Sequence, residues 1–196
     1  MNANPKPAAQ ARKPRADSAR NRQLLIDTAK AAFADVGVGV SLEEIARRAK
    51  VGIGTLYRHF PSREAVVEAV YRHEVEQLAE AVPRLLKSSP PDEALHKWMH
   101  LFVDYIATKR LIAPSLGAAT GGTSALRANS SELITHAMTT LVKRAAERGQ
   151  VRKDIAPSDL LRAMVGVSYG NPDDAWEASA RRLIDLLMDG LRRKRR

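Results

Sequence analysis

The stretch that most constrains the fold of this chain runs from Ser41 to Phe60, with the sequence SLEEIARRAKVGIGTLYRHF. Ser41 followed three residues later by Glu44 is a capping box, in which the serine hydroxyl accepts an N–H of the first turn and the glutamate reaches back to the cap. A helix is therefore expected to begin here. One of its faces is apolar at helical spacing, through Leu42, Ile45, Ala46 and Ala49.

A second short helix follows a break at residues 50–52. Leu56 and Phe60 lie four residues apart and face inward together, while a hydroxyl, a phenol, a guanidinium and an imidazole face outward from Thr55, Tyr57, Arg58 and His59. Two short helices joined by a turn that contains glycine form a helix-turn-helix candidate. Helical hairpins are also common in all-α proteins, so a merely structural pair remains the alternative.

The rest of the chain is predicted to be helical as well. Ser18 can cap a helix that ends at Gly37, and Ser62 can cap one that kinks or ends at Pro83. Further apolar stripes predict helices at 92–109, 133–149, 157–167 and 173–191, a short segment at 111–116, a mobile connection at 117–131 and a turn at 170–172. No strand pattern extends beyond a few residues. The sequence predicts an all-α protein of about nine helices.

The net charge of +10 is distributed unevenly along the chain. Residues 1–63 contain 12 Lys or Arg against 5 Asp or Glu, residues 64–191 contain 15 against 17, and residues 192–196 contain 5 against none. A nearly neutral middle with basic ends fits a nucleic-acid reader joined to a domain with another task. A solvated charged surface would give the same counts.

Composition and motifs argue against several classes of protein. No apolar run approaches the length of a membrane span and no signal-peptide region is evident, so a cytoplasmic protein is predicted. Zero cysteines exclude disulfides, thiolate zinc sites and cysteine nucleophiles. The chain has no nucleophile elbow and no dinucleotide fingerprint, and Gly121-Gly122-Thr123 is no phosphate loop. We expect no enzyme activity and no cofactor.

One histidine pair has helical spacing. His96 and His100 lie four residues apart, so on a helix they share a face and could hold a metal ion. Residue 97 is Lys where a zinc protease motif has glutamate, and no third ligand is evident nearby. The sequence alone therefore predicts no metal site.

A helix that ends in AAFADVG precedes SLEEIARRAKV, which leads into GIGTLYRHFPSREAVVEAV. This order of elements and the T-L-Y-x-H-F core closely resemble the DNA-binding domain of the TetR family of transcriptional regulators, over about residues 20–70. The resemblance implies an N-terminal three-helix DNA-binding domain and a C-terminal helical ligand-binding and dimerisation domain. We expect a disordered basic arm at 1–17, these domains at 18–63 (helix-turn-helix 41–60) and 64–192, and a basic tail at 193–196.

The function implied by the resemblance is ligand-responsive regulation of transcription. The chain is expected to repress by binding double-stranded DNA at a palindromic operator as a homodimer, and to be released by a small-molecule effector of unknown identity. No membrane partner is expected. The alternative is an all-helical enzyme or small-molecule-binding bundle whose N-terminal helix pair is only structural.

The resemblance also implies which residues meet DNA. Tyr57 and His59 contact phosphates, Thr55 and Arg58 can reach base edges or phosphates, and Gly54 allows close approach. Many relatives have polar side chains where this chain has Gly52-Ile53-Gly54, so base readout is expected to rest on fewer side chains. The full set of predicted DNA contacts is Ser41, Lys50, Gly54, Thr55, Tyr57, Arg58, His59 and Arg63.

Two surfaces are predicted in the C-terminal part. Aromatic bulk beside the glycine-rich stretch predicts a pocket lined by Trp98, Phe102, Tyr105, Leu116 and Met138. Plain core packing would explain the same rings. The last two helices are expected to pair with a second copy of the chain. The alternative is that both helices pack only against the core of their own chain. The predicted interface residues are Leu160, Leu161, Met164, Leu183, Ile184, Leu187 and Leu191.

Overall fold

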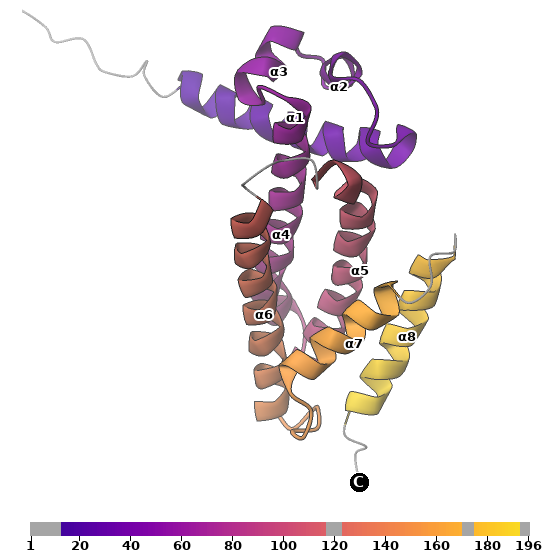
Figure 1. Cartoon of the computed structure of the whole chain (residues 1–196). Coiled ribbons are helices and arrows are strands. Elements are labelled where there is room, and N and C mark those ends of the chain that lie inside the picture. Colours follow the sequence, from indigo (N-terminus) through magenta and orange to yellow (C-terminus); the bar gives the residue numbers. More distant parts are fainter. Residues whose placement is uncertain (1–12, 117–122, 170–174, 193–196) are drawn as a thin grey trace, which may run out of the picture. The chain divides into compact units, whose positions relative to one another are not determined.

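The computed structural model describes residues 13–116, 123–169 and 175–192 (Figure 1). Within these ranges the chain forms eight helices and no strand, apart from one isolated bridge between Val151 and Arg192. The all-α prediction is confirmed, with eight helices in place of about nine. The basic tail at 193–196, the glycines at 117–122 and the predicted turn at 170–172 lie outside the described residues.

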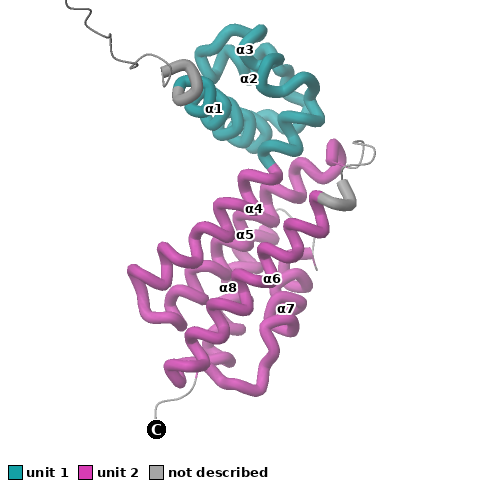
Figure 2. The backbone as a smooth tube through the Cα atoms, turned by 90° about the vertical axis from the view of Figure 1, so that its left-hand side faces the viewer, with its two compact units in different colours: residues 1–70 teal, residues 71–196 magenta. Residues whose placement is uncertain are grey.

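The chain divides into two compact units, residues 1–70 and residues 71–196 (Figure 2). The first unit holds α1 (Lys13–Val36), α2 (Leu42–Arg48), α3 (Ile53–His59) and the start of α4 (Arg63–Ser88). The boundary between the units falls inside α4, somewhat later than the predicted domain boundary at 63. Apolar side chains from all four helices bury themselves in the core of this unit, among them Leu25, Ile26, Phe33, Ile45, Leu56, Phe60, Val66 and Val67.

The ends of these helices follow the predicted capping residues, with two differences. Gly37 follows α1 with a φ of +97°, and its N–H donates to the Phe33 carbonyl at 2.9 Å. Ser41 accepts the Glu44 N–H at 3.1 Å, but the Glu44 carboxylate binds two arginines instead of reaching back. A carboxylate gains more from a charged guanidinium than from a neutral N–H.

The second difference is the start of α1, which begins at Lys13 rather than at Ser18. Pro14 lies in the first turn, where a missing N–H costs no intrahelical bond, so the helix needs no cap at Ser18. The last residues of the predicted basic arm are therefore helical. Residues 1–12 lie outside the described part.

The second unit contains the rest of α4 with α5 (Pro91–Leu116), α6 (Thr123–Glu147), α7 (Pro157–Tyr169) and α8 (Trp176–Leu191). Helix α5 is central, because it packs against α6, α7 and α8. Its inward face supplies much of the core, with Leu95, Trp98, Met99, Phe102, Val103, Ile106 and Ile112 all buried.

Three predicted breaks are helical in the structure. Helix α4 passes through Pro83 to Ser88, and α5 passes through Lys109 to Leu116, which merges two predicted segments into one. Pro83 is exposed and follows a helical stretch in which Val75, Leu78 and Val82 are buried, so packing on that side offsets part of the cost of about 3 kcal/mol for an interior proline. Helix α6 starts at Thr123, inside the stretch predicted to be a mobile connection.

Within the described ranges, none of the eight helices combines the length and the apolar character that crossing a membrane requires.

Candidate nucleic-acid interface and ligand pocket

Helix α3 presents a polar face to solvent because its apolar side chains anchor it from behind. Leu56 and Phe60 are buried at 0% and 3% exposure. Tyr57 is 46% exposed and Arg58 is exposed beside it. Thr55 and His59 are half-buried at the edges of this face. Four of the side chains predicted to contact DNA thus lie on one short helix, whereas Ser41, Lys50 and Arg63 lie outside it.

The first turn of α3 carries one large side chain, the exposed Ile53, between Gly52 and Gly54. A Cβ added at Gly52 or Gly54 would meet nothing within 4 Å, and neither glycine has a positive φ. Neither the backbone conformation nor crowding by neighbours therefore requires glycine here, although glycine inside a helix costs about 1 kcal/mol relative to alanine. The two glycines leave the end of α3 open to close approach by another surface.

Arg63 and Ser41 make contacts inside the first unit. Arg63 donates from one guanidinium nitrogen to the carbonyls of Val38 and Val40, at 2.8 and 2.7 Å. These bonds hold the segment between α1 and α2 against the start of α4. The Ser41 hydroxyl caps α2. Both residues shape the helix-turn-helix, and their polar groups are engaged by protein.

Charges on α2 and at the turn fall into two groups. Glu44 binds Arg47 at 2.7 Å and Arg48 at 2.8 Å, and these hydrogen bonds lower the pKa of Glu44 to about 2. Arg47 and Arg48 are thus neutralised in part by a carboxylate. Lys50, which has a φ of +55°, and Arg58 are exposed, and neither makes an ion pair with any residue that the structure describes.

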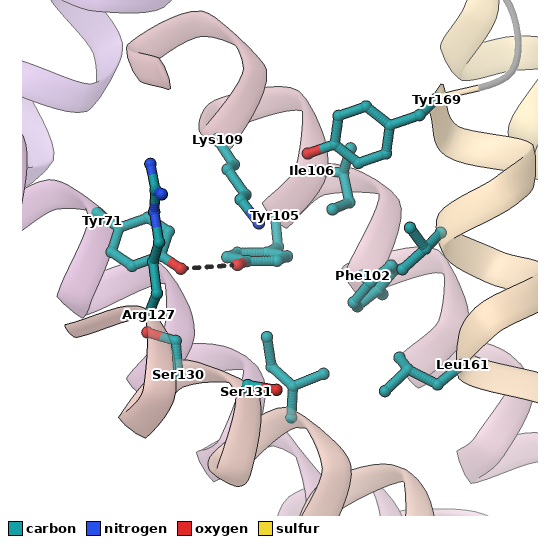
Figure 3. A pocket seen from close by; sticks show the side chains of 12 residues that line it. Tyr71, Phe102, Tyr105, Ile106, Lys109, Arg127, Ser130, Ser131, Leu161 and Tyr169 are labelled. Carbon is teal, nitrogen blue, oxygen red and sulfur yellow. Dashed lines mark hydrogen bonds between the residues drawn. The ribbon is translucent and has the colours of Figure 1, made fainter. Parts of the chain in front are cut away.

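A pocket of about 250 Å³ opens in the second unit (Figure 3). Its described lining includes two of the five residues predicted for it, Phe102 and Tyr105. Trp98 and Met138 are fully buried and Leu116 nearly so, and they do not contribute to this lining. The lining residues are Tyr71, Phe102, Tyr105, Ile106, Lys109, Arg127, Ser130, Ser131, Ile134, Leu161, Val165 and Tyr169.

The Trp98 side chain lies in the core and does not line the pocket, because its ring is held there by a hydrogen bond. Its ring N–H donates to the Leu78 carbonyl at 2.8 Å, which fastens α5 to α4 in the core. An aromatic stripe in a sequence does not show which ring faces a cavity. Lys109 shares a face of α5 with Tyr105, four residues earlier, and that spacing is the signal that would have identified it.

Three polar groups of the pocket lie close together. The hydroxyls of Tyr71 and Tyr105 lie 3.2 Å apart, and the Lys109 ammonium lies 5.7 Å from the centre of the Tyr105 ring (Figure 3). Burial, and next the hydrogen bond with Tyr71, raise the pKa of Tyr105, so its phenol stays neutral. Arg127 and Ser131 reach the same pocket from α6. The described lining includes two cations and no acidic side chain.

The predicted interface residues separate into two groups. Leu160, Met164, Ile184 and Leu191 are buried in the core of the chain itself, and Leu161 lines the pocket. Leu183 is 39% exposed and Leu187 is half-buried. Two further apolar side chains that were not predicted are exposed, Leu186 at 67% and Val165 at 41%. Helix α8 thus has two apolar stripes: a core stripe of buried residues that includes Ile184 and Leu191, and an exposed stripe that includes Leu183 and Leu186.

These features define a helix-turn-helix DNA-binding protein with a second helical unit that contains a pocket. The family described as bacterial regulatory proteins, tetR family, matches residues 25–70, and the family described as transcriptional regulator SbtR-like, C-terminal domain, matches residues 90–193. The chain therefore belongs to the TetR family of transcriptional regulators. Regulators of this family bind DNA and small-molecule effectors and act as dimers.

Solved structures and curated proteins agree with this assignment. The chain is 40% identical to the TetR transcriptional regulator SCO0520 from Streptomyces coelicolor, with 89% of this chain and 99% of that chain covered and a TM-score of 0.79. It is 31% identical to a TetR transcription regulatory protein from Mycobacterium vanbaalenii, with 91% and 99% covered and a TM-score of 0.76. It is also 23% identical to the HTH-type transcriptional regulator UidR of Escherichia coli (strain K12), over 76% of this chain and 78% of that protein.

Proposed function

We propose that this chain is a repressor that binds a palindromic operator as a homodimer and is released by a small anionic effector. The observation that carries the proposal is α3, whose exposed Tyr57 and Arg58 stand beside a first turn left open by Gly52 and Gly54. In this proposal the first unit binds DNA and the second binds effector and partner. The protein acts in the cytoplasm, where it meets DNA, and has no enzyme activity.

The described contacts support different roles for the predicted DNA residues. Tyr57 and His59 serve as phosphate contacts, and Arg58 and Thr55 face the base edges. Lys50 offers an exposed charge to the phosphate backbone. Arg63 and Ser41 act indirectly, because their polar groups hold the helix-turn-helix together.

The test begins with duplexes selected from a random library by the purified protein. Arg58→Ala is expected to cost about 1–3 kcal/mol on the selected site if it reads a guanine, and to relax sequence preference. Tyr57→Ala should weaken selected and random duplexes alike. Arg144→Ala on α6 removes another exposed arginine and is the control. Unchanged operator affinity in Tyr57→Ala at matched salt would refute the placement of α3 on DNA.

The effector is proposed to be an apolar molecule that carries one anionic group. Lys109 and Arg127 supply positive charge, Tyr71 and Tyr105 supply hydroxyls, and the remaining wall is largely apolar. A carboxylate could displace the contact between the two tyrosines and gain charge-assisted hydrogen bonds. Because Tyr71 belongs to α4, the helix that begins at Arg63, an effector that moves Tyr71 acts on the helix that holds the helix-turn-helix.

Matched ligand pairs test the effector class. Aromatic and short-chain carboxylic acids would be titrated beside their methyl esters, with release of operator DNA as the readout. We expect the acids to act and the esters not to act, and Lys109→Met to remove that difference without changing operator affinity in the absence of ligand. An ester preference in the wild-type protein would refute the anionic class.

The dimer is proposed to form through the exposed apolar stripe of α8. Leu183 and Leu186 lie on this stripe, and burial against a symmetry-related copy would remove them from water. Two recognition helices in successive major grooves need a separation of about 34–36 Å. A palindromic operator is the sequence that such a two-fold pair reads.

A further inference from the structure

A cluster of two histidines and one carboxylate lies on the second unit, away from the pocket lining. His96 and His100 belong to α5 and Asp185 belongs to α8. His96 Nε2 lies 2.7 Å and His100 Nε2 lies 2.9 Å from the same Asp185 oxygen, Oδ1. The two Nε2 atoms lie 3.2 Å from each other. Three potential ligand atoms thus form a closed triangle.

The Asp185 oxygen can accept a hydrogen bond from each histidine when both Nε2 atoms carry protons, at 2.7 and 2.9 Å. The two Nε2 atoms then converge on one oxygen and lie 3.2 Å from each other. Convergence of two imidazole nitrogens and a carboxylate oxygen is also the arrangement that binds a cation, because each of the three atoms can offer it a lone pair.

We propose that His96, His100 and Asp185 bind a divalent transition-metal ion of the zinc class. Atoms at these three separations lie on a circle with a radius of about 1.7 Å. An ion about 1.1 Å out of their plane would therefore lie about 2.0–2.1 Å from each, which is the length of zinc bonds to nitrogen and oxygen. For the tetrahedral angles typical of zinc, the three ligand atoms would move apart by a few tenths of an ångström, to separations of about 3.3 Å.

The ligand set selects the kind of metal. Two imidazole nitrogens and one carboxylate suit zinc, cobalt, nickel or copper, whereas magnesium and calcium prefer oxygen ligands alone. His96 and His100 are 27% and 28% exposed and Asp185 is 53% exposed, so solvent can reach a fourth coordination position.

The site joins two helices that are distant in sequence. A metal ion would cross-link α5 to α8 at Asp185, next to the outward-facing Leu186. This role is separate from the proposed DNA and effector sites, because none of the three ligands lines the pocket or lies in the first unit. Failure of the metal proposal would leave the proposed function intact.

The test uses the full-length, untagged protein after removal of metal with a chelator. Calorimetric titration with Zn²⁺ is expected to show one ion per chain, and Mg²⁺ should give no heat at the same concentrations. His100→Gln and Asp185→Asn should each weaken Zn²⁺ binding by more than about tenfold, since loss of even an outer-shell partner costs about 10–100-fold. His136→Gln, an exposed histidine on α6, is the control and should bind like the wild type.

Co²⁺ gives a second readout that does not depend on any variant. Absorption typical of tetrahedral or five-coordinate Co²⁺ with nitrogen ligands, which disappears in Asp185→Asn, would support the site. Far-UV circular dichroism of each variant checks that it is folded. Absence of Zn²⁺ binding by the wild type, or binding that persists unchanged in the folded His100→Gln and Asp185→Asn variants, would overturn the proposal.

Discussion

Replacement of Arg63 by alanine should destabilise the first unit, although the resemblance to relatives suggested a DNA contact. The guanidinium donates at 2.8 and 2.7 Å to the carbonyls of Val38 and Val40, and Val40 is itself buried at 6% exposure. Hydrogen bonds to charged groups contribute about 1.5–3 kcal/mol each. Because Arg63 is half-buried and water can replace part of this, we expect a total loss of about 2–3 kcal/mol.

The two tryptophans make the measurement specific to one unit. Trp98 and Trp176 both lie in the second unit, so tryptophan fluorescence reports that unit during urea unfolding. Far-UV circular dichroism reports both units. Arg63→Ala should shift the part of the circular dichroism transition that comes from the first unit to a lower urea concentration, and should leave the midpoint of the fluorescence transition unchanged. Arg63→Lys, which keeps the charge but not the planar fork, should lose about half as much.

DNA binding separates the two roles of Arg63. If the residue acts through the fold, operator affinity should fall with the fraction of folded first unit, and the dependence of affinity on salt should keep its slope. Loss of a phosphate contact would reduce that slope by about 0.9 for each contact. Unchanged stability together with a reduced salt slope would refute the structural role.

Three further predictions concern stability and assembly. The pKa of Glu44 is lowered from 4.5 to about 2 in the folded protein, so its contribution to stability is present above pH 4.5 and is lost as the pH falls towards 2. In Glu44→Gln, the unfolding free energy of the first unit should therefore depend less on pH between these two values, as measured by urea titration at graded pH. Trp98→Phe removes the ring N–H that the Leu78 carbonyl accepts and leaves a gap in the core, so urea titration should show a loss of about 1–3 kcal/mol with effector affinity unchanged. Leu186→Glu should sediment as a folded monomer that no longer binds the operator, and a wild-type protein that is monomeric with operator binding intact would contradict the proposed interface.

Local patterns in the sequence were sufficient for the first unit and for the fold class. The helix-turn-helix was predictable because its signals are local: the serine cap at Ser41, the glycine end at Gly37 and the apolar spacing of Leu56 and Phe60. The errors were at prolines and glycines. Propensity predicted a kink or an end at Pro83 and a mobile connection at 117–131, but α4 continues through Pro83 to Ser88, and residues 123–131 are helical with Leu126 buried.

Sites formed by several helices were less predictable. The pocket includes Tyr71 from α4 and Arg127 from α6, and no spacing within one helix connects them to Tyr105. The same limit hid the third residue of the histidine cluster, because Asp185 lies 85 residues after His100. In α8, a helix with leucine or isoleucine at most apolar positions, periodicity alone did not separate the core stripe from the exposed one.

Three faces of helix α8 have different environments, and two of these faces carry the proposed metal site and the proposed dimer interface. Ile184 and Met188 fill the core, Asp185 faces the histidines of α5, and Leu183 and Leu186 face outward. An ion bound by Asp185 restrains the rotation and position of α8, and hence the position of the apolar stripe that is proposed to pair with a second copy. If both proposals hold, zinc should strengthen dimerisation, and by linkage dimerisation should strengthen zinc binding; with one site in each of two subunits, the factor in the dimer constant equals the square of the factor in the affinity of each site. Sedimentation at graded protein concentration, with and without Zn²⁺, measures one side of this equality and calorimetry across the same range measures the other. Equal dimer constants in the two conditions would show that the ion and the interface are independent.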